Sequence, residues 1–160
     1  MASSPAENIV LYVMGKQCKL NKGLRSAVDD VIQKHEITLL QTVKTLLATG
    51  RSLEATFLST AKEIFTDNTC SWARILIVYI FGAYLAKTYK EECVQFDITR
   101  FAGTMDIFLM IKCGKWMDEH GSFEQMEACF PAPKEDRVMK GLLFTAVIAL
   151  TAICVVSITR

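Results

Sequence analysis

Apolar residues recur three and four positions apart along the first part of the chain, which is the spacing of one helix face. The stripes are Ile9–Met14, Leu24–Ile32, Leu39–Leu47 and Phe57–Phe65. Each stripe predicts an amphipathic helix, the first over about residues 6–19, the third ending at the turn 48–50 and the fourth near Asp67. No segment alternates between apolar and polar residues for long enough to predict a strand. The pattern therefore predicts an all-α domain.

The segment Ile75–Ala86 departs from this pattern, because its twelve residues are apolar on every side. A helix of this kind is expected inside a bundle, and it is too short to cross a bilayer. A sixth helix, with apolar residues from Phe96 to Leu109, is predicted beside it, followed by a short helical piece around Trp116. We therefore expect amphipathic helices packed around a central apolar helix.

A last helix of the domain is predicted after a break at His120–Gly121. Ser122 and Gln125 have the S-x-x-Q spacing of a capping box, in which both side chains accept hydrogen bonds from backbone N–H groups at the start of a helix. Pro131 and Pro133 are expected to end this helix, because proline removes a backbone donor and clashes with the preceding turn.

Residues Gly141–Thr159 form a run of nineteen residues without a charge. As a helix the run would measure about 28 Å, close to the ~30 Å hydrocarbon core of a bilayer, and cations flank it on both sides. The run predicts a C-terminal transmembrane helix, with a buried core helix as the alternative. We thus expect a helical domain over residues 1–136 and a membrane anchor over residues 137–160.

Composition narrows the range of functions. The chain is 51% apolar and 22% charged, with 18 basic and 17 acidic residues, so it is expected to be neither disordered nor a nucleic-acid-binding polycation. The sequence lacks the motifs of hydrolases, phosphate-binding loops and metalloproteases, and neither His35 nor His120 has a metal-ligand spacing. We expect no enzymatic activity, no cofactor and no nucleic-acid partner.

The N-terminus and the cysteines both indicate the cytosol. Glu7 and Asn8 interrupt the apolar stretch that a signal peptide would need. None of the six cysteines belongs to a C-x-x-C pair, so we expect thiols in a reducing compartment. The helical domain is therefore expected to face the cytosol from a tail anchor.

Arg74 follows a polar loop and lies in the first turn of the central apolar helix. The helix dipole is positive there and disfavours a cation by ~0.3–1 kcal/mol, so an anionic group should compensate. This group is either an internal Asp or Glu, or an acidic side chain of a partner protein that Arg74 holds in a bidentate contact. Physical reasoning alone weighs the two sources equally.

Four sequence motifs resemble those of the Bcl-2 family of apoptosis regulators. Ser71–Gly82 is similar to the first homology motif of that family, N-W-G-R-[IV]-x5-F-G, and Trp116–Phe123 is similar to the second, W-[IL]-x3-G-G-W. Leu24–Asp29 resembles the third motif, L-x3-G-D, and Glu7–Val10 resembles a shortened fourth. The order and spacing of the motifs, with the predicted anchor, make the resemblance more specific than any one motif.

The sequence departs from the family pattern at several positions. Ser71 and Ala73 replace the Asn and Gly of the first motif, Val28 replaces the Gly of the third, and Ser122 and Phe123 replace the Gly and Trp of the second. Ala73 adds a methyl group where the family's glycine lets a partner helix approach closely. The short connection between the first two helices resembles compact viral homologues of the gammaherpesvirus type.

The resemblance implies a Bcl-2-like bundle of amphipathic helices around a central apolar helix, with a surface groove that binds a partner helix. Arg74 would pair with an aspartate of the ligand, and Ser71 would support this ion pair. Ala73 would lie at the closest approach of the ligand, and Phe81 at the base of the groove. Extending the register adds four residues as pocket walls, for which core packing is the alternative: Val31, Leu39, Ile64 and Phe130.

The remaining residues of the two tryptophan motifs are interpreted as structural: Trp72, Gly82, Trp116 and Gly121. We expect the two tryptophans to pack at helix ends and not to contact the ligand.

The resemblance further implies an anti-apoptotic function. The partners would be pro-apoptotic relatives of the Bax and Bak type and ligands that carry only the death-motif helix, and their capture would prevent permeabilisation of the mitochondrial outer membrane. The sequence leaves open whether autophagy proteins with a similar helix also bind. The anchor suits the mitochondrial outer membrane or the endoplasmic reticulum. Two alternatives are a pro-apoptotic, membrane-permeabilising member of the same fold and a tail-anchored helical scaffold without groove binding.

Overall fold

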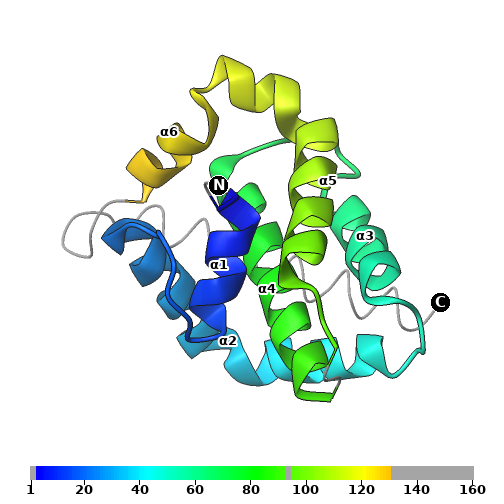
Figure 1. Cartoon of the computed structure of the whole chain (residues 1–160). Helices are drawn as coiled ribbons and strands as arrows, with labels where there is room; N and C mark the ends of the chain where they lie inside the picture. The colour runs from blue at the N-terminus through cyan, green and yellow to red at the C-terminus, as the bar shows by residue number, and fades with distance from the viewer. Residues whose placement is uncertain (1–2, 93–94, 131–160) are drawn as a thin grey trace.

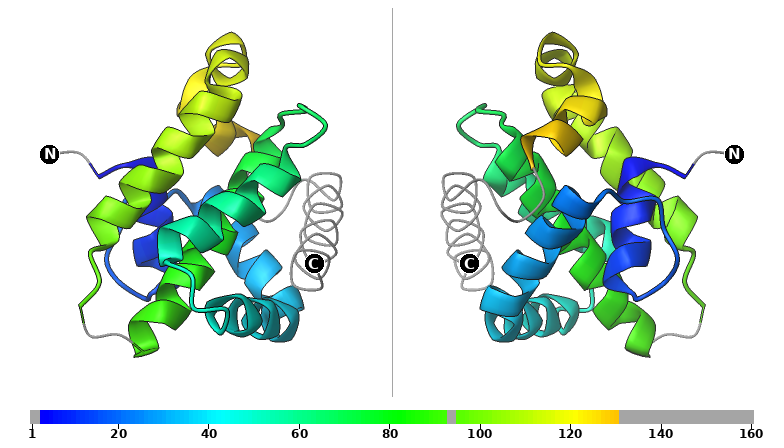
Figure 2. Two further views of the ribbon diagram at one scale, coloured as in Figure 1. Left: turned by 90° about the vertical axis from the view of Figure 1, so that its right-hand side faces the viewer. Right: turned by 90° about the vertical axis from the view of Figure 1, so that its left-hand side faces the viewer.

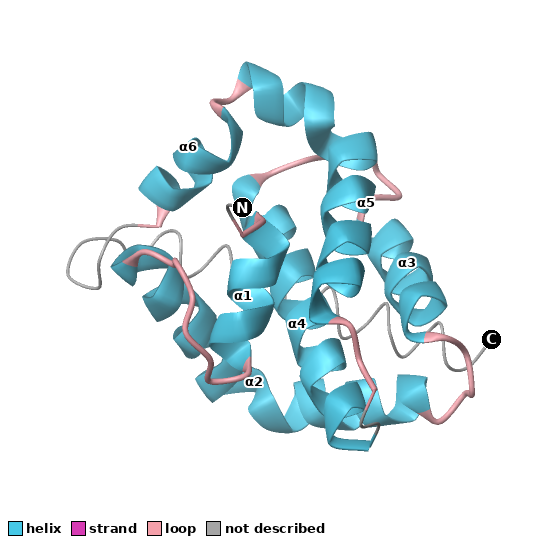
Figure 3. Ribbon diagram, in the orientation of Figure 1, coloured by secondary structure: helices cyan, strands magenta, loops and turns pink. Residues whose placement is uncertain are grey.

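The computed structural model describes residues 3–92 and 95–130, and within these ranges it contains helices but no strand (Figure 1, Figure 3). The helices are α1 (Pro5–Val13), α2 (Lys22–Leu47), α3 (Leu53–Ile64), α4 (Trp72–Glu92), α5 (Ile98–Glu119) and α6 (Ser122–Cys129). The all-α prediction is confirmed. The predicted anchor over residues 137–160 lies outside the described residues, as do Pro131 and Pro133. Of the six helices, none has both the length and the apolar character needed to cross a membrane.

Five of these helices begin at a polar residue whose side chain accepts a hydrogen bond from the first turn, and the cap of α4, Ser71, belongs to the site described below. Ser4 and Asn21 each accept from the backbone N–H three residues further on, at 3.1 and 2.8 Å. Ser52 and Asp97 cap α3 and α5 in the same way. Each cap satisfies an N–H group that has no partner within its helix, a contribution of typically about 1 kcal/mol.

The helix α4 lies at the centre of the bundle, where it contacts α1, α2, α3 and α5 (Figure 1). Its residues 75–86 are all buried. The prediction of a central apolar helix is therefore confirmed. The helix is longer than the apolar segment, because it continues into a last turn with Lys87, Lys90 and Glu91, which reach solvent.

Gly82 allows a close approach between α4, α5 and α3. A Cβ atom at this position would stand 2.5 Å from the terminal methyl carbon of Met105 and 3.1 Å from the ring of Phe57. Phe57 in turn packs edge-on against Phe101 and Phe108, with ring centroids 5.7 and 5.9 Å apart. A large side chain thus fills the space that the missing Cβ leaves, and three helices share one core.

A polar link joins α1 to the middle of α4 and α5. Oδ1 of Asp106 accepts hydrogen bonds from the hydroxyl of Tyr79 (2.9 Å) and from the backbone N–H of Ala6 (3.3 Å). Both donor residues are buried, Tyr79 at 4% exposure and Ala6 at 0%. The carboxylate therefore supplies an acceptor to groups that water does not reach.

The second and third predicted helices form one continuous helix, α2, of 26 residues. The break expected between the two apolar stripes is wrong. Residues 33–38 between the stripes are mostly polar and exposed, but Gln, Lys and Glu are good helix formers, so the helix continues along the surface. Figure 2 shows that α2 changes direction along its length, which brings its two halves against different parts of the bundle.

Three further boundaries differ from the prediction. The piece around Trp116 is not a separate helix, because α5 continues through it to Glu119. The capping box predicted at Ser122 is wrong, because the N-cap of α6 is Gly121 and no side chain accepts a hydrogen bond there. The backbone is left-handed at both positions, with φ of 94° at Gly121 and 61° at Ser122. The first helix ends at Val13 and not near residue 19, because Gly15 with φ of 73° turns the chain.

Candidate functional site

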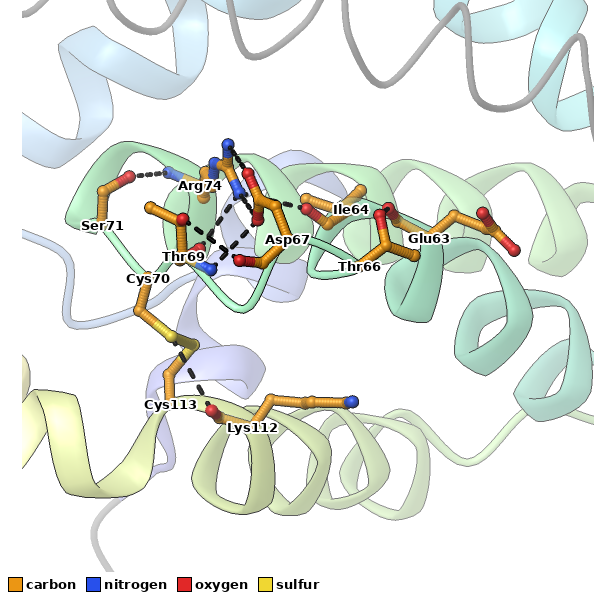
Figure 4. A network of polar contacts seen from close by, with 10 residues as sticks. All are labelled: Glu63, Ile64, Thr66, Asp67, Thr69, Cys70, Ser71, Arg74, Lys112 and Cys113. Carbon is orange, nitrogen blue, oxygen red and sulfur yellow. Dashed lines mark hydrogen bonds and ion pairs between the residues drawn. A yellow bond between two sulfur atoms is a disulfide. The ribbon is translucent and has the colours of Figure 1, made fainter.

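Arg74 forms a bidentate ion pair with Asp67, a residue of the loop between α3 and α4 (Figure 4). Nη1 of Arg74 donates to Oδ1 of Asp67 at 2.6 Å, and Nη2 donates to Oδ2 at 2.9 Å. Nη1 also donates to the carbonyl oxygens of Thr69 (3.1 Å) and Ile64 (3.3 Å). The guanidinium is thus held by the end of α3 and the loop, and its planar fork is matched to a carboxylate.

The ion pair shifts the pKa of both partners towards their charged forms. The hydrogen bond from Arg74, together with one from the backbone N–H of Thr69, lowers the pKa of Asp67 to about 2. The hydrogen bond to Asp67 raises the pKa of Arg74. Both side chains are therefore charged at physiological pH, and their attraction offsets the unfavourable position of a cation in the first turn of α4.

The structure answers the question of which anion compensates Arg74: an internal aspartate does so. The pair is nevertheless open to solvent, because the side chain of Arg74 is 30% exposed and that of Asp67 is 53% exposed. A carboxylate from another molecule therefore has access to the same guanidinium.

Ser71 and Ala73 lie next to Arg74 in the chain but have different surroundings. The hydroxyl of Ser71 accepts a hydrogen bond from the backbone N–H of Arg74 at 3.2 Å, and so caps the start of α4 (Figure 4). Through this cap Ser71 positions the backbone of Arg74, and it makes no hydrogen bond to the guanidinium in this structure. Ala73 is buried, with 6% exposure.

The residues predicted to line the pockets are mostly in the core. Four of them are between 1% and 4% exposed: Val31, Leu39, Phe81 and Phe130. Ile64 is half-buried and packs against the same core. Its carbonyl oxygen accepts a hydrogen bond from the guanidinium of Arg74. Core packing, which was the alternative for Val31, Leu39, Ile64 and Phe130, is present. The predicted roles of these four as pocket walls and of Phe81 at the base of the groove stay predictions.

The two tryptophans of the motifs lie against each other. The rings of Trp72 and Trp116 meet edge to face, with centroids 5.0 Å apart, and Trp116 stacks on His120 at 4.2 Å. Trp72 begins α4 and Trp116 belongs to the last turns of α5. The contact therefore joins the start of one helix to the end of the other, beside the loop that carries Asp67.

A disulfide between Cys70 and Cys113 ties this loop to α5, with the Cα atoms 6.0 Å apart (Figure 4). The expectation that all cysteines are thiols is wrong for this pair. The two cysteines are 43 positions apart in the sequence, so a search for neighbouring cysteines does not find them. Cys18 and Cys129 are free.

Asp67 is the residue of the site that sequence reasoning did not name as a partner of Arg74. Its only signal was an acidic side chain in the loop seven positions before the arginine. Glu63 lies in the same region, and nothing in the sequence separates the two candidates. Only the fold of the loop decides between them.

These observations define the class of the molecule: a helical bundle around a buried apolar helix, with a carboxylate-binding arginine at the start of that helix. The family model for apoptosis regulator proteins of the Bcl-2 family matches residues 24–122, and the chain belongs to this family. The matched region contains α2 from Leu24 onward, the whole of α3, α4 and α5, and the tryptophan motifs up to Ser122, including Arg74. Proteins of this family typically bind other members of it, and in general they are not enzymes.

Among characterised proteins, the chain is similar to the anti-apoptotic protein NR13 of Coturnix japonica, with 29% identity over 77 residues. The match covers 48% of this chain and 44% of the relative, so it spans less than half the length of that protein. No solved structure shows significant similarity to the chain.

Proposed function

We propose that this chain is an anti-apoptotic member of the Bcl-2 family, which captures the death-motif helix of pro-apoptotic relatives and thereby blocks permeabilisation of the mitochondrial outer membrane. Membership of the family and similarity to a protein named anti-apoptotic support the direction of the effect. The resemblance to compact viral survival proteins is in keeping with the short connection between α1 and α2.

The observation that carries the proposal is the bidentate contact between Arg74 and a carboxylate. The proposed ligand is an amphipathic helix with an aspartate, and this aspartate needs a cation of fixed geometry that solvent can reach. Arg74 meets both conditions, since its side chain is 30% exposed and both Nη atoms already hold a carboxylate. On binding, the aspartate of the ligand takes the place of Asp67.

Apolar side chains of the ligand would enter pockets beside Arg74. Val31, Leu39, Phe81 and Phe130 are buried in this structure, so binding requires that α2 and α6 move enough to expose them. Ile64 needs no such movement, because it is already partly exposed next to the guanidinium. We therefore expect binding to be coupled to a change in shape of the bundle.

The proposed partners are Bax- and Bak-type proteins and ligands that carry only the death-motif helix, with autophagy proteins of similar helix as a further class. The apolar run within residues 137–160 would hold the domain on the mitochondrial outer membrane or the endoplasmic reticulum. Its nineteen uncharged residues support this proposal.

The experiment that tests the function is a titration of the full chain, in a non-ionic detergent, with a labelled death-motif helix. The matched control is the same helix with its aspartate replaced by alanine. We expect submicromolar binding of the first peptide. We expect Arg74→Ala to weaken it by roughly tenfold to a hundredfold, as for loss of a charge-assisted pair.

A double-mutant cycle makes the assignment of Arg74 specific. Arg74→Ala should weaken binding of the aspartate peptide but leave binding of the alanine peptide nearly unchanged. Arg51→Ala, which removes another exposed arginine, should affect neither peptide. Equal losses with both peptides would assign the effect of Arg74→Ala to the fold of the loop and not to the ion pair.

Liposome release by the full chain distinguishes the alternatives. An anti-apoptotic protein should release no dye, with or without an activator peptide, and should suppress release by a Bax-type protein. Dye release by the chain itself would favour a membrane-permeabilising function. Absence of binding to every death-motif helix would favour a scaffold.

A further inference from the structure

The outer side of α5 exposes three large apolar side chains to solvent. Ile107, Met110 and Ile111 are 59%, 67% and 78% exposed, whereas the other large apolar residues in the middle of α5 are buried. Among the described residues, one further large apolar side chain is exposed in this way, Ile37 on α2 at 74%. A contiguous apolar patch on a helix indicates an interaction surface more strongly than one isolated residue does.

The residues that share this side of α5 have an ordered arrangement of charge. At about 100° per residue, six positions lie within roughly 40° of one line along the helix, and we call them the α5 face: Arg100, Thr104, Ile107, Ile111, Gly114 and Asp118. A cation lies at the first end, an anion at the last end and apolar side chains in the middle. Buried Cys113, which holds the disulfide, lies on the opposite side of the helix.

We propose that the α5 face binds the α5 face of a second copy of this chain, with the two helices antiparallel. A two-fold axis passes midway between Ile107 and Ile111. It places Ile107 of one copy against Ile111 of the second copy, and Ile111 of the first against Ile107 of the second. The same register places Arg100 opposite Asp118 of the second copy, twice, and Thr104 opposite Gly114. The face is therefore complementary to itself in charge, which an interface between identical subunits requires.

Both charged side chains of the face reach solvent. Within residues 3–92 and 95–130, Arg100 and Asp118 form no ion pair, and both side chains are exposed. An anionic membrane surface would attract Arg100 and the neighbouring Lys115 but would repel Asp118 and Glu119, so it satisfies only part of this side of the helix. A second copy satisfies the cation and the anion together.

The glycines of α5 support a close approach of another backbone. Among the described residues, a Cβ atom at Gly103 would meet nothing within 4 Å, and one at Gly114 would meet only the side chain of Met110 at 3.6 Å. Packing among these residues therefore does not require glycine at either position, although glycine inside a helix is less stable than alanine. Small residues beside the apolar pair let two helices come within contact distance.

The face is narrow, so the association is expected to be weak. One helix pair buries less area than a standard stable interface of about 1,200–2,000 Å². We expect a dissociation constant in the micromolar range. A high local concentration, as on a membrane, would then favour the associated form. Arg74 is not part of the α5 face, and the inference stands independently of the proposed function.

The test is energy transfer between donor- and acceptor-labelled full chains in a non-ionic detergent, over a range of concentrations. We expect transfer that rises with concentration for the natural sequence. Ile111→Asp should raise the dissociation constant at least about tenfold, because it buries a carboxylate in the apolar middle of the interface. Ile37→Asp is the matched control, since it changes an equally exposed isoleucine on another helix, and it should leave the association unchanged.

Charge reversal tests the antiparallel register itself. Arg100→Asp and Asp118→Arg should each weaken the association, roughly tenfold, because each turns two attractive contacts into repulsive ones. The chain with both substitutions should associate like the natural one, and so should an equimolar mixture of the two single variants. Circular dichroism checks that these surface variants are folded.

Three results would overturn the inference. The first is a monomer at every concentration, and the second is association that Ile111→Asp and the single charge reversals leave intact, which would place the contact elsewhere. The third is weakening by both single reversals without recovery in the double variant, which would exclude the proposed register.

Discussion

Two aspartates beside α4 show how surroundings decide what the same side chain does. Asp67 lies in an exposed loop and pairs with a cation, Arg74, whereas Asp106 is partly buried and accepts hydrogen bonds from the neutral donors of Tyr79 and Ala6. The hydrogen bond from Arg74 lowers the pKa of Asp67 to about 2, but burial raises the pKa of Asp106. Asp67 is thus bound through an ion pair in solvent, whereas Asp106 is bound through hydrogen bonds from buried neutral groups.

This difference bears on function. A carboxylate in solvent can leave its cation and be replaced by another, because water solvates it in either state. A carboxylate between buried donors has no such freedom, since its removal leaves those donors without a partner. We therefore expect Asp67 to modulate ligand binding and Asp106 to stabilise the bundle.

The largest expected effect concerns the loop of Asp67. Reduction of the Cys70–Cys113 disulfide should lower the free energy of unfolding by about 2–4 kcal/mol, because the bond closes a long loop in the unfolded chain. The measurement is urea unfolding with and without a reductant. A variant with Cys70→Ala and Cys113→Ala should not respond to the reductant. Identical unfolding midpoints for the oxidised and reduced natural chain would contradict the prediction.

Removal of the buried aspartate is expected to have the next largest effect. Asp106→Ala should lower the free energy of unfolding by about 1–3 kcal/mol, because the Tyr79 hydroxyl and the Ala6 N–H lose their acceptor. Asp67→Ala is the matched control, and its loss should be clearly smaller. A greater loss for Asp67→Ala, measured by the same urea unfolding, would reverse the comparison.

Asp67→Asn should strengthen binding of the death-motif helix, by roughly threefold to tenfold, because the ligand no longer competes with an internal carboxylate for Arg74. Peptide titration measures the change. Asp30→Asn, at an aspartate whose ion pair is with Lys34 and not with Arg74, serves as the control. Weaker binding by Asp67→Asn would mean that Asp67 holds Arg74 in place for the ligand.

The smallest expected effect is on the acid side of the stability curve, where the two aspartates act with opposite sign. The pKa of Asp67 is lowered from 3.8 to about 2, so its contribution is present above pH 3.8 and is lost as the pH falls towards 2. The pKa of Asp106 is raised, so its contribution is present below pH 3.8 and is lost as the pH rises through the raised pKa.

Urea unfolding at a series of pH values separates these signs. On acidification, the stability advantage of the natural chain over Asp67→Asn should shrink, whereas its advantage over Asp106→Asn should grow. Parallel changes for the two variants would show that the aspartates do not differ in this way.

Much of the fold was predictable because helical patterns are local. The apolar stripes located the amphipathic helices, and the uniformly apolar segment 75–86 identified the central helix. The errors fall at junctions: α2 is continuous although its middle is polar, and α6 begins at Gly121 in place of a Ser122 cap. At such points the helix propensity of polar residues and the conformation of the backbone decide whether a helix continues or ends. The apolar pattern contains neither kind of information.

The sequence by itself determined that the chain is helical, that one helix is buried on all sides and that Arg74 needs an anion. Each of these follows from residues within one or two helical turns. The tertiary structure alone decided that Asp67 supplies the anion and that Cys70 meets Cys113. These depend on how the α3–α4 loop folds against α5, and distance in space does not follow from position in the chain.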